Sequence, residues 1–418
     1  MTVRRRVQCG ASVVLIFIGS LWSAADARAQ SAVGSGPLTS PLADTEPTVG
    51  VLSVGPVKLA PGMTIREIGW DDNVFQEPTN QGPKSDWAVS VQPDISAFTR
   101  LRLVRISAHA GADLTYYKTY ESERSVGQGG NARVDFLLSR VRPFIGGGVN
   151  ETRTRPNGEI DVRADRQEDE VSGGLAFDLS PTSLVYGSAF QSRSRYEDAL
   201  EDGVNLSQTM SRDTFNYQVG MKTDLTPLLS MQLSGHYSED RFPFEPIRNG
   251  EAKLATATFR IAQDAVVSGA ITASYRDATY ADPGLKPQRG LIGNAAIIYP
   301  FLEIGRLMFS ASRGVEYSFD ISEGYYEEQS IGLSYTHRLF GDVDAQVRGS
   351  RSSFKYDARE TLPSHTDTLE MAAGSLGYNL RNRTRVALNY EYALRRSPAF
   401  SQRNYVRRRA YLSWLFAF

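Results

Sequence analysis

The sequence predicts an all-β fold, a single transmembrane antiparallel up-and-down β-barrel of eighteen strands. Three observations support this prediction. Apolar and polar residues alternate with a period of two along most of the chain, short and long connections follow one another in strict alternation, and the last strand ends in an aromatic residue. This combination is typical of barrels in the Gram-negative outer membrane.

The N-terminus has the features of an exported chain. Residues 4–6 are all arginine, residues 11–18 form a short apolar stretch, and residues 27–29 read Ala-Arg-Ala. These features predict a signal peptide over residues 1–29, with cleavage after Ala29. An N-terminal membrane anchor is the alternative, but a spanning helix needs about 20 residues and the apolar stretch is far shorter.

Two further features set the domain boundaries. The single cysteine, Cys9, lies within the predicted signal peptide, so the mature chain is expected to have no disulfide and no thiolate metal site. Residues 30–61 are rich in Pro, Gly, Ser and Thr without a period, which predicts a periplasmic leader or linker. A segment tucked into the barrel mouth is the alternative. The barrel itself is predicted over residues 62–418.

The strand prediction depends on side-chain alternation. In residues 229–237, Leu, Met, Leu, Gly and Tyr alternate with Ser, Gln, Ser and His, and residues 215–221 and 386–392 alternate in the same way. After residue 29 no apolar run approaches the about 20 residues of a spanning helix. A membrane-spanning chain of this kind must be a closed barrel, because only helices and barrels satisfy the backbone in lipid.

The connections predict the number of strands. Eight short turns are expected near residues 99–100, 139–142, 179–183, 224–228, 263–264, 300–305, 340–342 and 381–383. Nine longer polar loops are expected at residues 71–86, 117–130, 152–168, 192–211, 238–250, 276–289, 319–328, 357–367 and 395–404. They join eighteen strands with both ends on the periplasmic side, or sixteen if one hairpin is misjudged. A propeller or a stack of soluble sandwiches would not explain the strict alternation.

The last strand carries a candidate assembly signal. Its apolar positions are Leu412, Trp414, Phe416 and Phe418, which share one face and end the chain on an aromatic ring. A strand of this kind resembles the signal read by the outer-membrane barrel assembly machinery, which we therefore expect as a partner.

The first predicted strand leads into a motif. Residues 65–75 read Ile-Arg-Glu-Ile-Gly-Trp-Asp-Asp-Asn-Val-Phe, and the motif positions are Gly69, Asp71, Asp72, Asn73, Val74 and Phe75. This motif resembles the start of the family called putative beta-barrel porin 2, with Trp70 where a Tyr is more usual. The resemblance covers residues 62–418 and implies an outer-membrane barrel. Some members of the family are associated with exopolysaccharide production or export.

The two strand faces predict an outer girdle and a wet lumen. Outward aromatic residues expected at the membrane interfaces are Tyr237, Tyr275, Tyr317 and Trp414. Inward polar residues expected to line the lumen are Asn216, Gln218, Gln232, Asn389 and Glu391. Aromatic residues at the loop roots could instead guide a sugar chain.

Arginines gather near the last external loop. They are Arg395, Arg396, Arg403, Arg407, Arg408 and Arg409, of which the first four form a candidate basic mouth. Such a mouth would attract anions or acidic polysaccharide. The alternative, which we favour, is that these arginines pair with loop acids and with lipopolysaccharide phosphates.

No catalytic residues, cofactor or metal site are expected, and so no enzymatic activity. His236, Ser238 and Asp240 share a strand face, and a His-x-Ser pair resembles that of outer-membrane lipid A deacylases. Residues two apart in a strand lie about 7 Å apart, too far for direct proton transfer without side-chain reach, and this face is expected to point into the lumen. The net charge of −1 argues against a nucleic-acid partner.

Three functions are compatible with the sequence. The first is a porin-like channel passing solutes through a polar lumen. The second is a component of polysaccharide export, with an anionic polysaccharide and periplasmic export proteins as partners. The third is a structural or surface-binding barrel plugged by inward loops such as residues 152–168 or 192–211. Outer-membrane lipid and lipopolysaccharide are expected partners in all three, since periodicity alone does not separate open from plugged barrels.

Overall fold

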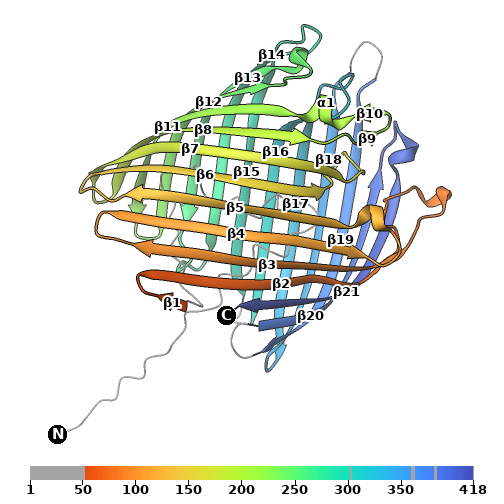
Figure 1. Ribbon diagram of the computed structural model, residues 1–418, viewed down its shortest axis with the longest axis horizontal. Helices are drawn as coiled ribbons and strands as arrows, with labels where there is room; N and C mark the ends of the chain where they lie inside the picture. Colours follow the sequence, from red (N-terminus) through yellow and green to blue (C-terminus); the bar gives the residue numbers. More distant parts are fainter. Residues whose placement is uncertain (1–51, 302–303, 359–362, 381–383, 418) are drawn as a thin grey trace.

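A computed structural model describes residues 52–301, 304–358, 363–380 and 384–417. The predicted signal peptide with its cleavage after Ala29, the leader up to residue 51, the turn at 381–383 and Phe418 lie outside the described residues. Within the described chain, strands dominate (Figure 1). No helix in this part of the chain is long and apolar enough to cross a membrane.

Eighteen antiparallel strands form one closed barrel, as the sequence predicted. They are β2 (Val57–Asp71), β3 (Asp86–Arg100), β4 (Val104–Tyr117), β5 (Ser125–Phe136), β6 (Val141–Thr154), β7 (Ala164–Ser180), β8 (Ser183–Tyr196), β11 (Arg212–Thr226), β12 (Leu229–Arg241), β13 (Gly250–Ile261), β14 (Ser268–Tyr280), β15 (Gln288–Phe301), β16 (Gly305–Tyr317), β17 (Tyr325–Phe340), β18 (Val343–Tyr356), β19 (His365–Leu380), β20 (Thr384–Arg396) and β21 (Tyr405–Ala417). Each strand pairs with the next in sequence, and β2 pairs with β21 to close the sheet.

Small elements decorate the barrel. A short strand β1 (Leu52–Val54) pairs with the start of β2. The connection between β8 and β11 contains the hairpin β9 (Leu200–Glu201) and β10 (Val204–Asn205), followed by helix α1 (Leu206–Met210). Single 3-10 turns occur in four other long loops, η2 (Thr79–Gln81), η3 (Glu121–Glu123), η4 (Pro246–Arg248) and η5 (Ser401–Arg403). All of these but β1 lie at the end of the barrel opposite the short turns (Figure 1).

Short and long connections lie at opposite ends of the barrel (Figure 1). Two-residue turns join β7 to β8, β11 to β12 and β17 to β18, whereas the connection from β2 to β3 spans residues 72–85. β1 and the C-terminal end of β21 lie at the end with the short turns. Within the described residues this is the predicted outer-membrane arrangement of short periplasmic turns and longer external loops.

The first strand begins at Val57, five residues before the predicted barrel boundary at residue 62. Residues 57–61 pair with β3, whereas β21 joins β2 only from Gly62 onward. Pro61, which lacks a backbone N–H, therefore lies where β2 is still a sheet edge, a position that tolerates proline. β1 pairs with the other edge of β2 only at residues 57–59, so Ala60 and Pro61 have a described partner strand on one side. The Pro-rich composition that predicted a linker here is compatible with this position.

Outward side chains form an apolar belt that faces lipid. Leu291, Leu333 and Leu388 are each at least half exposed on successive parts of the wall. Tyr275 and Trp414 also face outward as predicted, and the Tyr237 ring stacks on the outward Tyr217 ring. Exposed leucines of this kind are suited to contact with lipid hydrocarbon, which covers these side chains in place of a protein core.

Tyr317 does not belong to the outer girdle, so its predicted placement was wrong. It is the last residue of β16, and its ring packs against Phe242 and Tyr280. Its hydroxyl donates to Asp240 Oδ2 at 3.3 Å. At the end of a strand the wall no longer fixes the side-chain direction, so the ring follows the next loop inward.

Gly69 lies in the seam between β2 and β21, at a point where the two strands approach closely. A Cβ at this position would lie 2.2 Å from the Ala410 carbonyl oxygen and 2.4 Å from Tyr411 Cβ. We expect Gly69→Ala to destabilise the barrel by about 1–3 kcal/mol through overpacking. Gly235→Ala is the control, because a Cβ there meets nothing within 4 Å. Urea unfolding of the refolded barrels in detergent measures both, and equal midpoints would contradict a tight seam.

Candidate functional site

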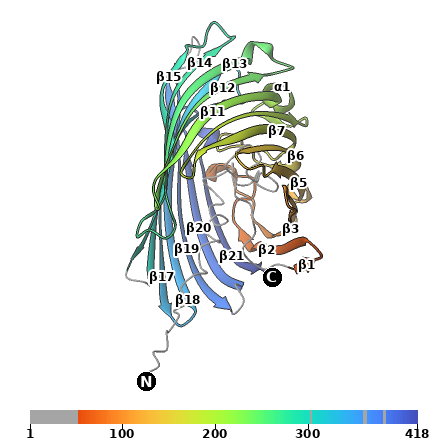
Figure 2. The same cartoon turned by 90° about the vertical axis from the view of Figure 1, so that its left-hand side faces the viewer.

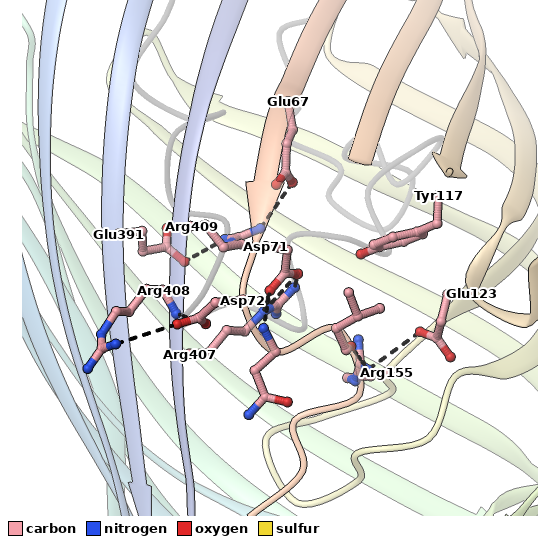
Figure 3. A network of polar contacts seen from close by, with 12 residues as sticks. Glu67, Asp71, Asp72, Tyr117, Glu123, Arg155, Glu391, Arg407, Arg408 and Arg409 are labelled. Atoms are coloured by element: carbon pink, nitrogen blue, oxygen red, sulfur yellow. Dashed lines mark hydrogen bonds and ion pairs between the residues drawn. The ribbon is translucent and has the colours of Figure 1, made fainter. Parts of the chain in front are cut away.

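The sequence motif after the first strand fastens the first strand to the last. Asp71, fully buried, accepts two hydrogen bonds from Arg407 Nε at 3.0 and 3.1 Å and is paired with its Nη2 (Figure 3). The Asn73 amide donates to the Val406 carbonyl at 2.9 Å and to the Glu77 carbonyl at 2.8 Å. These contacts lie directly beyond the last backbone pair of the seam, Asp71 with Arg409.

The rest of the motif anchors the loop to the wall. Asp72 Oδ1 accepts from the Arg408 backbone N–H at 2.5 Å, and its carboxylate lies 3.8 Å from the exposed Arg408 guanidinium (Figure 3). Val74 packs with Ala88 and Tyr117 in a buried apolar cluster, against which Phe75 also packs. The six motif residues therefore close the barrel at its external rim.

The predicted basic mouth is not a patch of free cations. Arg395, 1% exposed, pairs with Asp161 and Asp367, and Arg403 lies 3.4 Å from Asp202. Arg396 is exposed rather than directed into the lumen. Arg407 pairs with Asp71, and Arg409 pairs with Glu67 at 3.1 Å and Glu391 at 2.5 Å. The geometry matches the alternative in which the arginines pair with acids. Several of these acids, such as Asp71 and Asp161, are distant from the arginines in sequence.

Loop 155–163 leaves the wall between β6 and β7 and enters the lumen. The Arg155 guanidinium donates to the Asp161 carbonyl within the loop at 2.6 Å and to the Val74 carbonyl at 2.9 Å. It also lies 3.6 Å from Glu123 (Figure 3). The base of the loop is thus fixed to two neighbouring loops on the same side of the barrel.

The tip of this loop reaches the facing wall. Glu159, fully buried, accepts hydrogen bonds from Ser318 Oγ at 2.6 Å, from the Phe319 backbone N–H at 3.1 Å and from Tyr356 Oη at 3.1 Å. Figure 2 shows β6 and β7 on one wall and β17–β19 on the wall opposite. A loop that begins at β6 and bonds to the end of β18 therefore crosses the lumen.

Apolar contacts complete the crossing. Ile160 forms a buried cluster with Leu206, Met210 and Phe319, which come from helix α1 and from the loop after β16. A Cβ on Gly158 would lie 2.6 Å from the Phe354 ring on β18, so glycine permits this close approach. The hypothesis of inward loops predicted that residues 152–168 or 192–211 would fold inward, and parts of both do.

Beneath the loop the lumen contains a cavity of about 950 Å³. Its charged lining consists of Arg66, Arg153, Arg155, Arg163, Arg166, Arg212, Arg407, Arg409, Glu67, Asp113, Asp161, Glu168, Glu170, Glu316, Glu328 and Glu391. Eight arginines thus face eight carboxylates, so the described lining has no net charge. On the β18–β19 side, Phe354, Leu369 and Met371 make the lining apolar.

Burial changes the ionisation of groups in the loops. It raises the pKa of Glu159 to about 7 and also raises that of Glu323. Burial lowers the pKa of Arg248 to about 10. Burial alone would lower the pKa of Arg403, but the nearby carboxyl groups of Glu159 and Glu323 raise it. Protonation of Glu159, at the loop tip, is therefore accessible near neutral pH.

Other predicted lumen residues have structural partners. Gln218 and Gln232 donate to Tyr186 Oη at 2.9 and 2.5 Å. The His236 ring contacts Ser234 Oγ at 2.9 Å rather than Ser238. Asp240 accepts from Thr214 and Tyr317, which leaves the His-x-Ser arrangement without an orienting carboxylate. The geometry gives no support to a deacylase-like site.

Comparisons with known proteins also indicate a β-barrel. Residues 48–417 match the sequence family described as Putative beta-barrel porin 2. The chain belongs to this family. The match to a family of beta-barrel porins and the closed barrel place this protein in the cell outer membrane. No curated protein matches the chain in sequence.

Solved structures resemble this porin-family chain in fold. OccK9 (OpdG) from Pseudomonas aeruginosa has a TM-score of 0.50 at 11% identity, over 86% of this chain and 98% of that one. OpdO from the same organism gives 0.49 at 15% identity, over 86% and 97%. A BenF-like porin from Pseudomonas fluorescens Pf-5 gives 0.49 at 10%, over 86% and 99%. At such identities the likeness concerns the fold alone.

The sequence did not single out Glu159, Ser318 and Glu323, which meet at the loop tip. Asn157-Gly158 is a turn signal within a loop already expected to be long. That signal could have indicated a tight tip, but nothing local indicated which wall the tip would reach. The site depends on contacts between residues 159 positions apart.

The paired arginines make a prediction about the seam. Asp71→Asn leaves the buried Arg407 guanidinium without its carboxylate, and we expect a loss of about 3–5 kcal/mol of unfolding free energy. Asp72→Asn is the matched control, because its ion pair with Arg408 is partly exposed and should change stability by less than about 1 kcal/mol. Urea unfolding in detergent compares them. Equal losses would show that the buried pair is not what holds the seam.

Proposed function

We propose that this protein is a constricted porin-like channel, which passes small polar solutes past loop 155–163. The observation that carries this function is the cavity of about 950 Å³ under an inward loop in a closed barrel of eighteen strands. Barrels of this size leave a water-filled lumen unless something fills it. Here the loop and helix α1 occupy the external end of the lumen, while polar walls continue below them.

The lining favours passage without strong charge selection. The eight arginines and eight carboxylates of the cavity wall balance, and several of them are already paired. A solute therefore meets alternating donors and acceptors rather than a field of one sign. The apolar side of the cavity, at Phe354, Leu369 and Met371, can contact a solute's hydrocarbon part.

The two other functions have weaker support. A permanently plugged barrel would need a filled lumen, whereas the cavity below the loop lies within the described residues. Polysaccharide export draws no support from the comparisons, in which the matching family is described as a beta-barrel porin. An acidic polymer would also need an unpaired basic path, whereas five of the six arginines at the rim, all but the outward Arg396, are paired with carboxylates.

The terminal strand is proposed to serve assembly. Leu412 and Trp414 are exposed on the outer face of β21, and the Trp414 ring contacts Phe416. An exposed apolar face on the closing strand is available to the assembly machinery before the seam forms. This proposal concerns biogenesis and is independent of conduction.

Loop removal tests the channel. We expect replacement of residues 156–161 by Gly-Ser-Gly to raise single-channel conductance several-fold in planar bilayers, because the lumen then loses its obstruction. The same replacement of residues 282–286, whose loop is absent from the cavity lining, is the control. Unchanged conductance in the first variant, with the barrel still folded, would overturn the constriction.

Charge balance gives a second expectation. In a salt gradient the reversal potential of the wild-type channel should lie near zero, with less than about threefold preference between potassium and chloride. A strong preference for either ion would show that the pairs along the wall do not screen one another.

A further inference from the structure

The tip of loop 155–163 ends in two carboxyl groups that share one hydroxyl. Ser318 Oγ lies 2.6 Å from Glu159 Oε1 and 3.0 Å from Glu323 Oε2. The same oxygen accepts a hydrogen bond from the Asp320 backbone N–H at 3.1 Å. All three side chains of this contact are 5% exposed or less.

A count of protons shows what this geometry requires. A serine hydroxyl has one proton and can donate only one hydrogen bond, whereas an ionised carboxylate can only accept. Ser318 can therefore donate to one of the two acids but not to both. The other contact is a hydrogen bond only if that carboxyl carries a proton and donates it to Ser318 Oγ.

We propose that a proton held between Glu159 and Glu323 latches loop 155–163 across the lumen, and that its loss opens the channel. Loss of the proton, which passes to water in the lumen, leaves two carboxylates against one hydroxyl. One hydrogen bond is lost and two like charges then face each other in a buried site, which is costly. Arg395 and the buried cluster around Ile160 also hold the loop tip to the wall. The contacts of Glu159 with Ser318 are the part of this attachment that depends on the proton.

The charged neighbours come from every element around the tip. Carboxyl groups are supplied by the loop itself at Asp161, by β9 at Glu201 and by β19 at Asp367, and guanidinium groups by η4 at Arg248, β20 at Arg395 and η5 at Arg403. Asp320 and Asp202 lie farther toward solvent, and Tyr356 from β18 donates to Glu159. His365 Nε2 lies 3.6 Å from Glu323 Oε1.

The balance among these groups favours a bound proton. Five largely buried carboxyls, Glu159, Asp161, Glu201, Glu323 and Asp367, meet the guanidiniums of Arg248, Arg395 and Arg403. A fourth guanidinium, Arg155, contacts Asp161 and is shared with Glu123. Arg395 is committed to Asp161, to Asp367 and to the Glu159 carbonyl. The Arg248 guanidinium donates to the Ser318 carbonyl, and its Nε and Nη1 have no hydrogen-bond partner among the described residues. Burial also raises the pKa of Glu201 to about 7, as it does for Glu159.

The direction of the pH effect follows from these raised pKa values. A carboxyl whose pKa is raised in the latched state stabilises that state below its ordinary pKa, and the stabilisation is lost as pH rises through the raised value. The latch is thus closed in acid and released above a pH of about 7. Release of one proton changes the open-to-closed ratio by at most tenfold per pH unit.

The test is single-channel recording of the refolded full-length chain between pH 5.5 and 8.5. Wild type should conduct more as pH rises, by up to tenfold per unit near the midpoint. Glu159→Gln should remain closed throughout, because the amide donates to Ser318 as the protonated acid would. Glu323→Gln should behave in the same way. Glu121→Gln, at an exposed loop carboxylate, is the matched control and should retain the wild-type pH profile.

Two outcomes overturn the latch. One is a wild-type channel that conducts equally at every pH while Glu159→Gln shows the same flat profile. The other is a profile that disappears in His365→Gln but persists in Glu159→Gln, since the histidine would then be the titrating group. Heat-modifiable gel mobility confirms that each variant forms the barrel.

The latch rests on the proposed channel function, so a second readout separates the two. In a Cys9→Ala background, Pro156→Cys places a thiol in the inward loop, three residues before Glu159, for maleimide labelling. Relative to a Cys at the exposed Glu121 position, labelling should accelerate as pH rises, and addition of Glu159→Gln should remove this acceleration. If no variant conducts but labelling follows this pattern, the channel function fails and the latch stands. If the relative labelling rate does not change with pH, the latch is wrong whatever the conductance.

Discussion

Closure of the sheet between β2 and β21 is the constraint on which the rest of the structure depends. In lipid an unpaired strand edge is too costly to persist, so the first and last strands must meet and stay together. The backbone ladder provides the meeting, with Gly69 permitting close contact to Tyr411. The buried pair of Asp71 with Arg407 and the bond from Asn73 to Val406 extend the seam into the external rim.

The same rim holds the obstruction of the lumen. Arg155 donates to the Val74 carbonyl, so the loop that enters the barrel is bonded to the segment that closes the sheet. Across the lumen, Arg395 of β20 binds Asp161 of that loop. The loop excludes solvent here, so hydrogen bonds between protein groups take the place of hydrogen bonds to water. The loop is therefore held by a network of specific bonds, which can be released, rather than by strand pairing.

The alternation of side chains was enough to predict the barrel, because lipid on one face and water on the other impose a period of two on every strand. The turns and loops followed from the same pattern. The prediction for Tyr317 was wrong because a residue at the end of a strand no longer obeys its phase. The arginines from 395 to 409 were read as a possible mouth because their partners Asp71, Glu67 and Asp161 are more than 200 residues away. Loop 155–163 was recognisable as long and polar, but its path across the lumen depends on Glu159 meeting Ser318. Such non-local contacts have no periodic signature.

The central claim is that a polar lumen is narrowed by loop 155–163, together with helix α1, to a size that admits only small solutes. Uptake of neutral sugars and polyethylene glycols of increasing size into liposomes containing the folded barrel measures this most directly. The structure predicts uptake of monosaccharides and a sharp fall for polymers longer than a few units. Free passage of large polymers, as expected for an unobstructed eighteen-stranded lumen, would contradict it, and so would exclusion of every solute at all pH values.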